Sequence, residues 1–552
     1  MQIEKFISIN WYIDRKPYNI HSGYDLFYLV ICRRLYSIID GLVEENREIV
    51  ELHKEDCREI AYVITAYFED QVNCIGFWRS LVQLHQKKFG KRLPFFDEKI
   101  LKEQEEEWED VLPADIHYLL FISYLNFVSN EGGKALVFFN KELFVQLTEK
   151  IVDCLNEIEE VPTTDFYQNY LAPDEDYIDF KHKLDWFTYE SYLTSIEFSR
   201  NIDDYLWKLM DQNVEKSLLS PLMYEERDRL MFEEPSSLTA FFPLDILAGA
   251  MRCSETKKEE IRQLKFRPHG IFHVQQETDT HYLFLHTSTS EEFTVTKKSF
   301  KEPFDSRKEE YWIATIASWS GEHHISGLCV PSPYEGEEIY HRNLQMQHNF
   351  QKHFAPYRQH LTETAVQYRN KAADFFGSNL IVFETGYQLQ QKLNEFEQWY
   401  FNTVADKSKI SDDAKPVQME LPKDILEASK PALFIPTEDG LQFVMQHEQL
   451  LHLLQTKETD KVSLEQIQEM LPMLFDDSVG VEYWFYLRKH FPLPNLSLFL
   501  KCPVEADEDF EALLRIYRSS DFSPLKLPRF TTFTSERISP ETAREIFELK
   551  KE

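Results

Sequence analysis

The sequence predicts a mainly α protein of the α+β class, in which one small antiparallel β module is inserted between two helical regions. Apolar residues recur at helical spacing through most of residues 1–255 and again after residue 335. Between them, the pattern changes to short runs of β-branched and aromatic residues. We therefore divide the chain into a helical domain over 1–255, a β module over 256–335 and an α-rich C-terminal region with a few short strands over 336–552.

The N-terminal helices are predicted from amphipathic repeats. Within residues 57–70, for example, Ile60, Ile64 and Tyr67 lie on one helical face. Asn73 is expected to cap the helix that follows and Gly90 to end it. The helices predicted in this region cover residues 23–42, 57–70, 73–90, 115–128, 141–160, 176–184 and 195–211.

The β module is predicted from five short strand-like runs separated by turn residues. Five strands with one longer connection suit a small barrel or a curled antiparallel sheet. The module also holds six of the 18 histidines of the chain, so it is a natural place to look for a site. The predicted strands cover residues 270–275, 282–287, 292–296, 311–319 and 324–330.

The C-terminal region is predicted to be helical again, with few strands. Residues 379–384 are predicted to form a strand, and the charged segment 405–430 to form a loop or linker. Capping residues at Ser463 and Ser539 indicate two further helices. The other helices predicted here cover residues 337–354, 358–376 and 388–404.

Composition narrows the classes of function. The formal net charge is −34, which disfavours binding to nucleic acid and to anionic membranes and favours basic partners. The longest apolar stretch, residues 118–128, is about half of what a membrane span needs. The seven cysteines form no C-x-x-C pair, and residues 1–16 show no signal-peptide pattern. We expect a cytoplasmic protein without a cofactor.

Histidines and carboxylates are the candidate metal ligands. His341 and His348 lie seven residues apart on the predicted helix 337–354, which separates them by about 10.5 Å. A metal ion between them would need a further ligand, and Glu338 lies on the same helix. His323 lies in a predicted hairpin beside His324, and neighbouring strand residues point to opposite faces. For His341 and His348, the alternative to a metal site is a polar helix face.

Established catalytic motifs fail on their spacing. In HEQLLH, residues 447–452, the two histidines lie five apart, whereas a zinc-binding helix needs them four apart. The sequence contains neither of the glycine-rich nucleotide-binding motifs G-x-x-x-x-G-K-[ST] and G-x-G-x-x-G.

A set of mainly aromatic and acidic residues near the N-terminus forms a distinctive pattern: Trp11, Pro17-Tyr18, Tyr24 to Leu29, Tyr67-Phe68-Glu69-Asp70, Trp78, His85, Gly90 and Leu93 to Phe96. On these residues the first 200 positions resemble a bacterial family of unknown function that is typical of gut-dwelling Bacteroidetes. The resemblance implies a cytosolic bacterial protein and no known activity. From the residues alone, we expect the aromatic side chains to seal helix contacts, and Glu69 and Asp70 to cap or solvate a helix end.

We therefore expect an interaction or scaffold module without catalysis, which binds another protein or a small ligand. The alternative is a metal-assisted hydrolase that uses histidines and carboxylates of the β module or of the 337–354 helix, with His323, Glu338, His341 and His348 as candidate ligands. A component of a mobile-element or phage-conflict system is a third hypothesis. The oligomeric state is left open.

Overall fold

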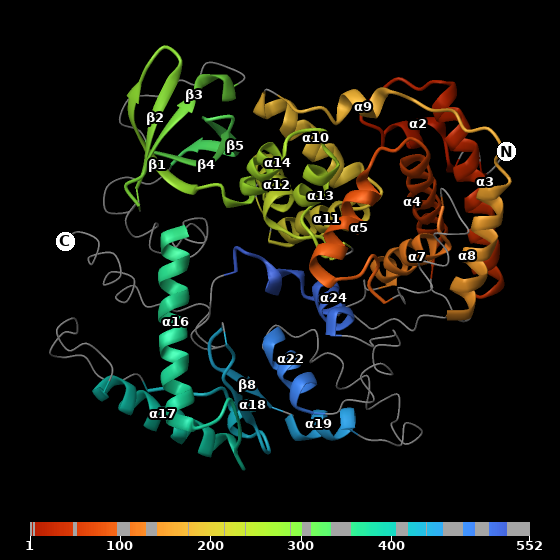
Figure 1. The fold of residues 1–552 in the computed structure, drawn as a ribbon. Coiled ribbons are helices and arrows are strands. Elements are labelled where there is room, and N and C mark those ends of the chain that lie inside the picture. The colour runs from red at the N-terminus through yellow and green to blue at the C-terminus, as the bar shows by residue number, and fades with distance from the viewer. Residues whose placement is uncertain are drawn as a thin grey trace. The chain divides into compact units, whose positions relative to one another are not determined.

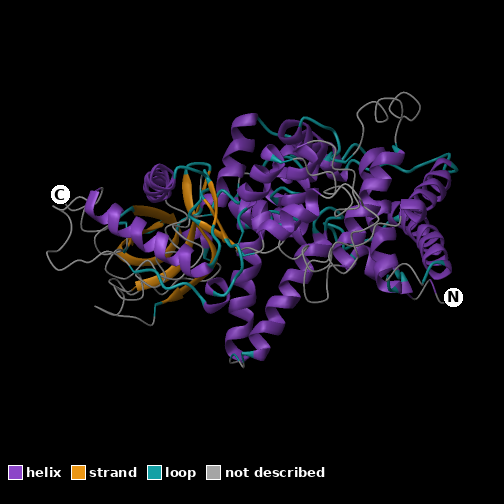
Figure 2. Ribbon diagram, turned by 90° about the horizontal axis from the view of Figure 1, so that it is seen from below, coloured by secondary structure: helices purple, strands orange, loops and turns teal. Residues whose placement is uncertain are grey.

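The computed structural model describes Ile3 and residues 6–47, 52–95, 111–128, 141–174, 176–212, 214, 216–237, 239–287, 289–300, 311–332, 355–403, 418–437, 439–445, 447–455, 479–491 and 507–526. The chain forms two compact units, Met1–Phe350 with Lys501–Leu525 and Gln351–Leu500 with Lys526–Glu552. Helices make up most of the described chain (Figure 2). The predicted mainly helical fold with a small sheet region is confirmed. The predicted division at residues 255 and 335 stays a prediction.

The first unit is built around one large helical core (Figure 1). Helix α11 begins and ends where the sequence predicts, and most other predicted helices extend by a few residues. Its helices are α2 (Ile9–Ile13), α3 (Gly23–Glu45), α4 (Lys54–Val72), α5 (Phe77–Phe89), α7 (Pro113–Val128), α8 (Lys141–Asn156), α9 (Phe166–Tyr170), α10 (Tyr177–Glu190), α11 (Ser195–Asp211), α12 (Lys216–Glu233), α13 (Pro243–Ala250), α14 (Glu255–Gln263) and α24 (Asp507–Tyr517).

The predicted start of α5 at Asn73 is wrong. Asn73 instead ends α4, and α5 begins at Phe77 after Gly76, whose φ of 106° breaks the helix between them. The capping oxygens come from Asp70, which accepts the Gly76 N–H at 2.6 Å and the Trp78 N–H at 2.7 Å. A side-chain carboxylate from the preceding helix therefore does what a local cap usually does.

The β module is a closed five-stranded barrel in the order β1-β2-β3-β5-β4. Four neighbouring pairs are antiparallel, as predicted, and β3 pairs with β5 in parallel. Five strands that alternate in direction cannot close into a ring without one parallel pair, so closure accounts for this exception. The strands are β1 (His269–Glu277), β2 (His281–His286), β3 (Glu292–Thr296), β4 (Tyr311–Trp319) and β5 (Glu322–Pro331).

Strand alternation fills the barrel with apolar side chains. Phe272, Phe284, Val295 and Ile316 are fully buried in this core. The β4–β5 register shifts between Ala314 and Thr315, so β5 bulges next to the helices.

The barrel joins the helical core through the end of β4. Trp319 is 1% exposed and belongs to the helical core rather than to the barrel core. Its ring stacks on Phe180 of α10 with centroids 4.6 Å apart, and the Lys257 Nζ of α14 lies 3.4 Å from the ring centroid. Helices α10, α12 and α14 lie beside the barrel (Figure 1).

The second unit packs helices on a three-stranded antiparallel sheet in the order β6-β7-β8. The strand predicted at 379–384 is present as the shorter β6. The helices predicted over 337–354, from Ser463 and from Ser539 lie outside the described residues, as do residues 405–417 of the predicted linker. The prediction of a loop is wrong in part for residues 418–430, because they contain the short helix α18 (Lys423–Leu426). The elements are α16 (Ala355–Phe376), β6 (Leu380–Val382), α17 (Gly386–Thr403), α18 (Lys423–Leu426), β7 (Ala432–Phe434), β8 (Gln442–Val444), α19 (His447–Gln455) and α22 (Val481–His490).

Among the described helices, we find none with the length and apolar composition that a membrane span requires.

Candidate functional site

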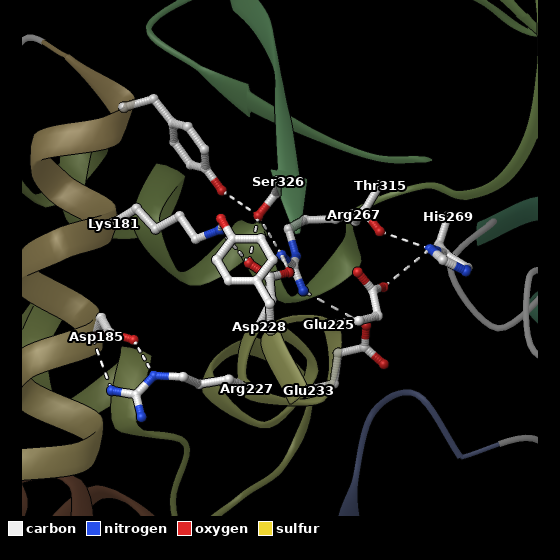
Figure 3. Close-up of polar contacts among 12 residues, drawn as sticks. Lys181, Asp185, Glu225, Arg227, Asp228, Glu233, Arg267, His269, Thr315 and Ser326 are labelled. Carbon is white, nitrogen blue, oxygen red and sulfur yellow. Dashed lines mark hydrogen bonds and ion pairs between the residues drawn. The ribbon is translucent and has the colours of Figure 1, made fainter. Parts of the chain in front are cut away.

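A buried ion network lies where the barrel meets the helices (Figure 3). Asp228 of α12 is at its centre and is 2% exposed. The Lys181 Nζ of α10 lies 2.6 Å from its Oδ1, and the Arg267 guanidinium, just before β1, contacts its Oδ2. The Ser326 hydroxyl of β5 donates to Oδ1 at 2.9 Å and accepts from the Tyr177 hydroxyl at 2.7 Å. Two helices and two parts of the barrel therefore meet at one carboxylate.

Two cations keep this carboxylate ionised. Burial by itself would raise the pKa of Asp228, but Arg267 and Lys181 outweigh it and lower that pKa to about 2. Burial opposes the charge on Lys181 as well, and the nearby Asp228 raises the lysine pKa despite it. Because Ser326 is fully buried and its hydroxyl is already engaged, it is not placed to attack a substrate. The network fastens the barrel to the helical body.

The neighbouring carboxylate Glu225 of α12 lies between His269 of β1 and the bulge of β5. His269 Nδ1 lies 2.7 Å from Thr315 Oγ1 and 3.7 Å from Glu225 Oε1. Gly327 has φ +66°, and a Cβ placed there would lie 2.8 Å from Glu225 Oε2 and 3.0 Å from Asp228 Oδ2. The bulge therefore needs glycine, both for its backbone angle and for the close approach of α12.

A second buried carboxylate, Asp115 of α7, holds N-terminal helices together. Asp115 is 1% exposed and accepts hydrogen bonds from Tyr67 at 2.7 Å and from the Trp78 indole at 2.8 Å. Arg92 binds both of its oxygens, at 2.6 and 2.8 Å. The hydrogen bonds from Tyr67 of α4 and Trp78 of α5 join both helices to α7, and the bidentate contact with Arg92 balances the charge of Asp115.

The expectation that Glu69 and Asp70 solvate a helix end is wrong, because both side chains are only 1% exposed. Glu69 forms a buried ion pair with Lys16 and accepts the Tyr24 hydroxyl at 2.9 Å. Asp70 points to α5 instead, so the two neighbouring carboxylates serve different contacts.

The loop that follows Gly90 receives the C-terminal helix of the unit. Asp509 of α24 accepts the Phe95 N–H at 2.9 Å and lies 2.9 Å from the Lys91 Nζ. Phe95 has φ 71°, an angle that only a few per cent of non-glycine residues adopt. Ala512 of α24 packs with Phe89. Phe95 of the pattern thus lies at a contact within the chain.

Of the sequence-predicted ligands, only His323 lies within the described residues; Glu338, His341 and His348 lie outside them. His323 packs edge-on against Phe293 with centroids 5.5 Å apart, and burial lowers its pKa. His324 instead faces the Tyr177 ring at 5.2 Å. In the part of the chain that the structure describes, no three His, Cys, Asp or Glu side chains are grouped closely enough to hold a metal ion.

An exposed aromatic face lies on α11. Trp207 is 62% exposed, and Met210, one turn further along the helix, is 50% exposed. Asp203, Asp204 and Asp211 surround this pair at helical spacings of three and four residues, and all three are exposed. We call these five residues the Trp207 face.

Comparison with known families covers part of the chain. Residues 7–263 match the family model described as Protein of unknown function (DUF3843). The predicted resemblance to an uncharacterised family is thereby confirmed, and it reaches beyond residue 200. No curated protein and no solved structure matches the chain.

The DUF3843 segment holds only part of the buried network. It includes Asp228 and Lys181, whereas Arg267 and Ser326 lie after its last matched residue. The Trp207 face lies entirely inside the segment.

Sequence reasoning missed both features. Nothing in the sequence around Arg267 shows that its side chain meets a carboxylate 39 residues earlier. The Trp207 face could have been found. In α11, Phe198, Leu206 and Leu209 lie on one side, and Trp207 and Met210 project away from it.

Proposed function

We propose that this chain is a cytoplasmic bacterial interaction protein that binds a protein partner without catalysis, and that the Trp207 face is its contact surface. The proposal is carried by the 62% exposure of Trp207 beside the half-exposed Met210. Tryptophan is the residue type most enriched among the side chains that dominate binding energy at protein interfaces. The fold gains little from an indole left in water.

The setting of the face also supports the proposal. From Asp203 to Gln212, Leu209 is the one buried residue. The C-terminal part of α11 is therefore exposed or half-exposed over most of its circumference. Helix α11 packs against α12, which the internal network around Asp228 ties to the barrel. A rigid support of this kind lowers the entropy lost on binding.

A second exposed apolar surface exists on α3. Leu26 and Val30 are 46% and 61% exposed, one turn apart, and Ile20 is 83% exposed just before the helix. Among the described residues, the exposed side chains of this surface include no aromatic anchor. Leucine and valine are under-represented among the dominant contacts of interfaces. Val30 therefore serves as a control, with almost the same exposure as Trp207.

Site-specific photo-cross-linking of the full chain in its native cells tests the proposal. A photoreactive amino acid with an aromatic side chain, which keeps a ring at the contact, is placed at position 207 or, as the matched control, at position 30. We expect one protein adduct from position 207 and none from position 30. Purified wild-type chain should compete the adduct away, and the Trp207→Ala variant should not. Equal labelling at both positions, or equal competition by the two proteins, would contradict the proposal.

The metal-assisted hydrolase remains the rival proposal, through histidines of the β module or of residues 337–354. Elemental analysis of the purified chain separates the two, because a stoichiometric transition metal would favour the rival.

A further inference from the structure

The Trp207 face is acidic. Aspartate is a poor helix former, yet three aspartates lie within nine consecutive residues of this helix. Asp211 is the last residue of the helix. The same turn carries one exposed cation, Lys208, about 100° round the helix from Trp207.

The arrangement has the layout of a binding surface. Trp207 and Met210 form an apolar centre, and the three carboxylates form a polar rim around it. In interfaces of this kind, the centre supplies most of the affinity, and the charges of the rim select the partner and speed its approach. A cation placed over the indole would also gain a favourable interaction with the ring.

We infer that the occupant of the Trp207 face is a basic segment of another protein, with an apolar side chain that covers Trp207 and Met210 and lysines or arginines opposite the aspartates. This inference rests on the proposed function and adds the chemical class of the partner.

Charge disfavours the other classes of occupant. Phosphate backbones and anionic lipid surfaces would meet Asp203, Asp204 and Asp211 with the same sign of charge. A second copy of this chain also carries a net charge of −34, so the two copies would repel each other.

Fluorine NMR of the full chain labelled with 5-fluorotryptophan tests the partner class. The Trp207 resonance is assigned from the Trp207→Phe variant. The probes are three helical peptides of one length, built from leucine with lysine, with glutamine or with glutamate. We expect the Leu/Lys peptide to shift the Trp207 resonance saturably, at least tenfold more tightly than the Leu/Gln peptide. The D203N/D204N/D211N variant should remove that advantage, whereas Lys208→Gln should keep it.

Each contrary result has a separate meaning. Equal binding of the Leu/Lys and Leu/Gln peptides, or an advantage that survives D203N/D204N/D211N, overturns the basic partner and leaves the Trp207 face as an apolar contact. Binding of the Leu/Glu peptide overturns it as well. If no peptide shifts the resonance, the inference fails, and cross-linking at position 207 still decides the proposed function.

Discussion

Ser326 and Asp228, 98 residues apart, share a hydrogen bond of 2.9 Å in which the β5 hydroxyl donates to the α12 carboxylate. Both side chains are buried, and Arg267 contacts both. The barrel is therefore attached to the helices through charge as well as through the packing of Trp319. Breaking such a network by removing one partner is costly, because the remaining charges stay buried.

Asp228→Ala should destabilise the chain by about 3–5 kcal/mol, since it leaves Arg267 and Lys181 without their shared counter-charge. The matched control is Asp185→Ala. Asp185 pairs with Arg227 at 2.9 Å, but both side chains are more than a third exposed, so we expect a loss of less than about 1 kcal/mol. Urea unfolding followed by circular dichroism measures both variants. Equal losses would show that Asp228 is not the centre of the network.

Gly327→Ala should cost about 1–3 kcal/mol, because alanine is strained at φ +66° and its Cβ would crowd Glu225 and Asp228. Gly41→Ala is the control, and its effect on stability should have the opposite sign. Gly41 lies inside α3, and a Cβ added there would meet nothing within 4 Å, so alanine should stabilise the chain by about 0.5–1 kcal/mol. Melting temperatures of the two variants should move in opposite directions. A neutral Gly327→Ala would contradict the described bulge.

Stability should fall as the pH drops from about 6.5 to about 4. Burial lowers the pKa of His85 and of His286 from 6.5 to about 4. Between these values the unfolded chain binds protons that the folded chain does not, so the stabilisation present above pH 6.5 is lost as the pH falls. Each histidine should contribute about 3 kcal/mol to this loss.

The slope of the unfolding free energy against pH tests this point. His85 lies among the rings of Phe89, Tyr118 and Phe241, so His85→Phe suits its surroundings. This variant should lower the slope near pH 5 by about 1.4 kcal/mol per pH unit, which corresponds to one proton. His182→Gln, at an exposed position, is the control and should leave the slope as it is. An unchanged slope in His85→Phe would mean that His85 titrates alike in both states.

Periodicity predicts the elements of this chain better than their contacts. The bounds of the strands Glu292–Thr296 and Tyr311–Trp319 are predicted to the residue, because runs of β-branched and aromatic residues between turn residues are a local signal. The capping of α5 by Asp70 depends on a side chain six residues before Gly76, outside the usual capping pattern.

The candidate site was predictable only in part. The network around Asp228 joins residues from four separate segments, and a single sequence does not show which charges meet. Trp207 lies opposite the apolar side of an amphipathic helix. The sequence shows this, because only the helical period is needed to find it.

The affinity of the full chain for the protein cross-linked at position 207 tests the central claim most directly. Isothermal titration calorimetry with the purified partner compares wild type, Trp207→Ala and Val30→Ala. We predict that Trp207→Ala weakens the affinity by about 30-fold or more, as expected for the loss of about 2 kcal/mol or more at a dominant contact, while Val30→Ala leaves it unchanged. Equal affinity of wild type and Trp207→Ala would contradict the assignment of this face as the binding surface.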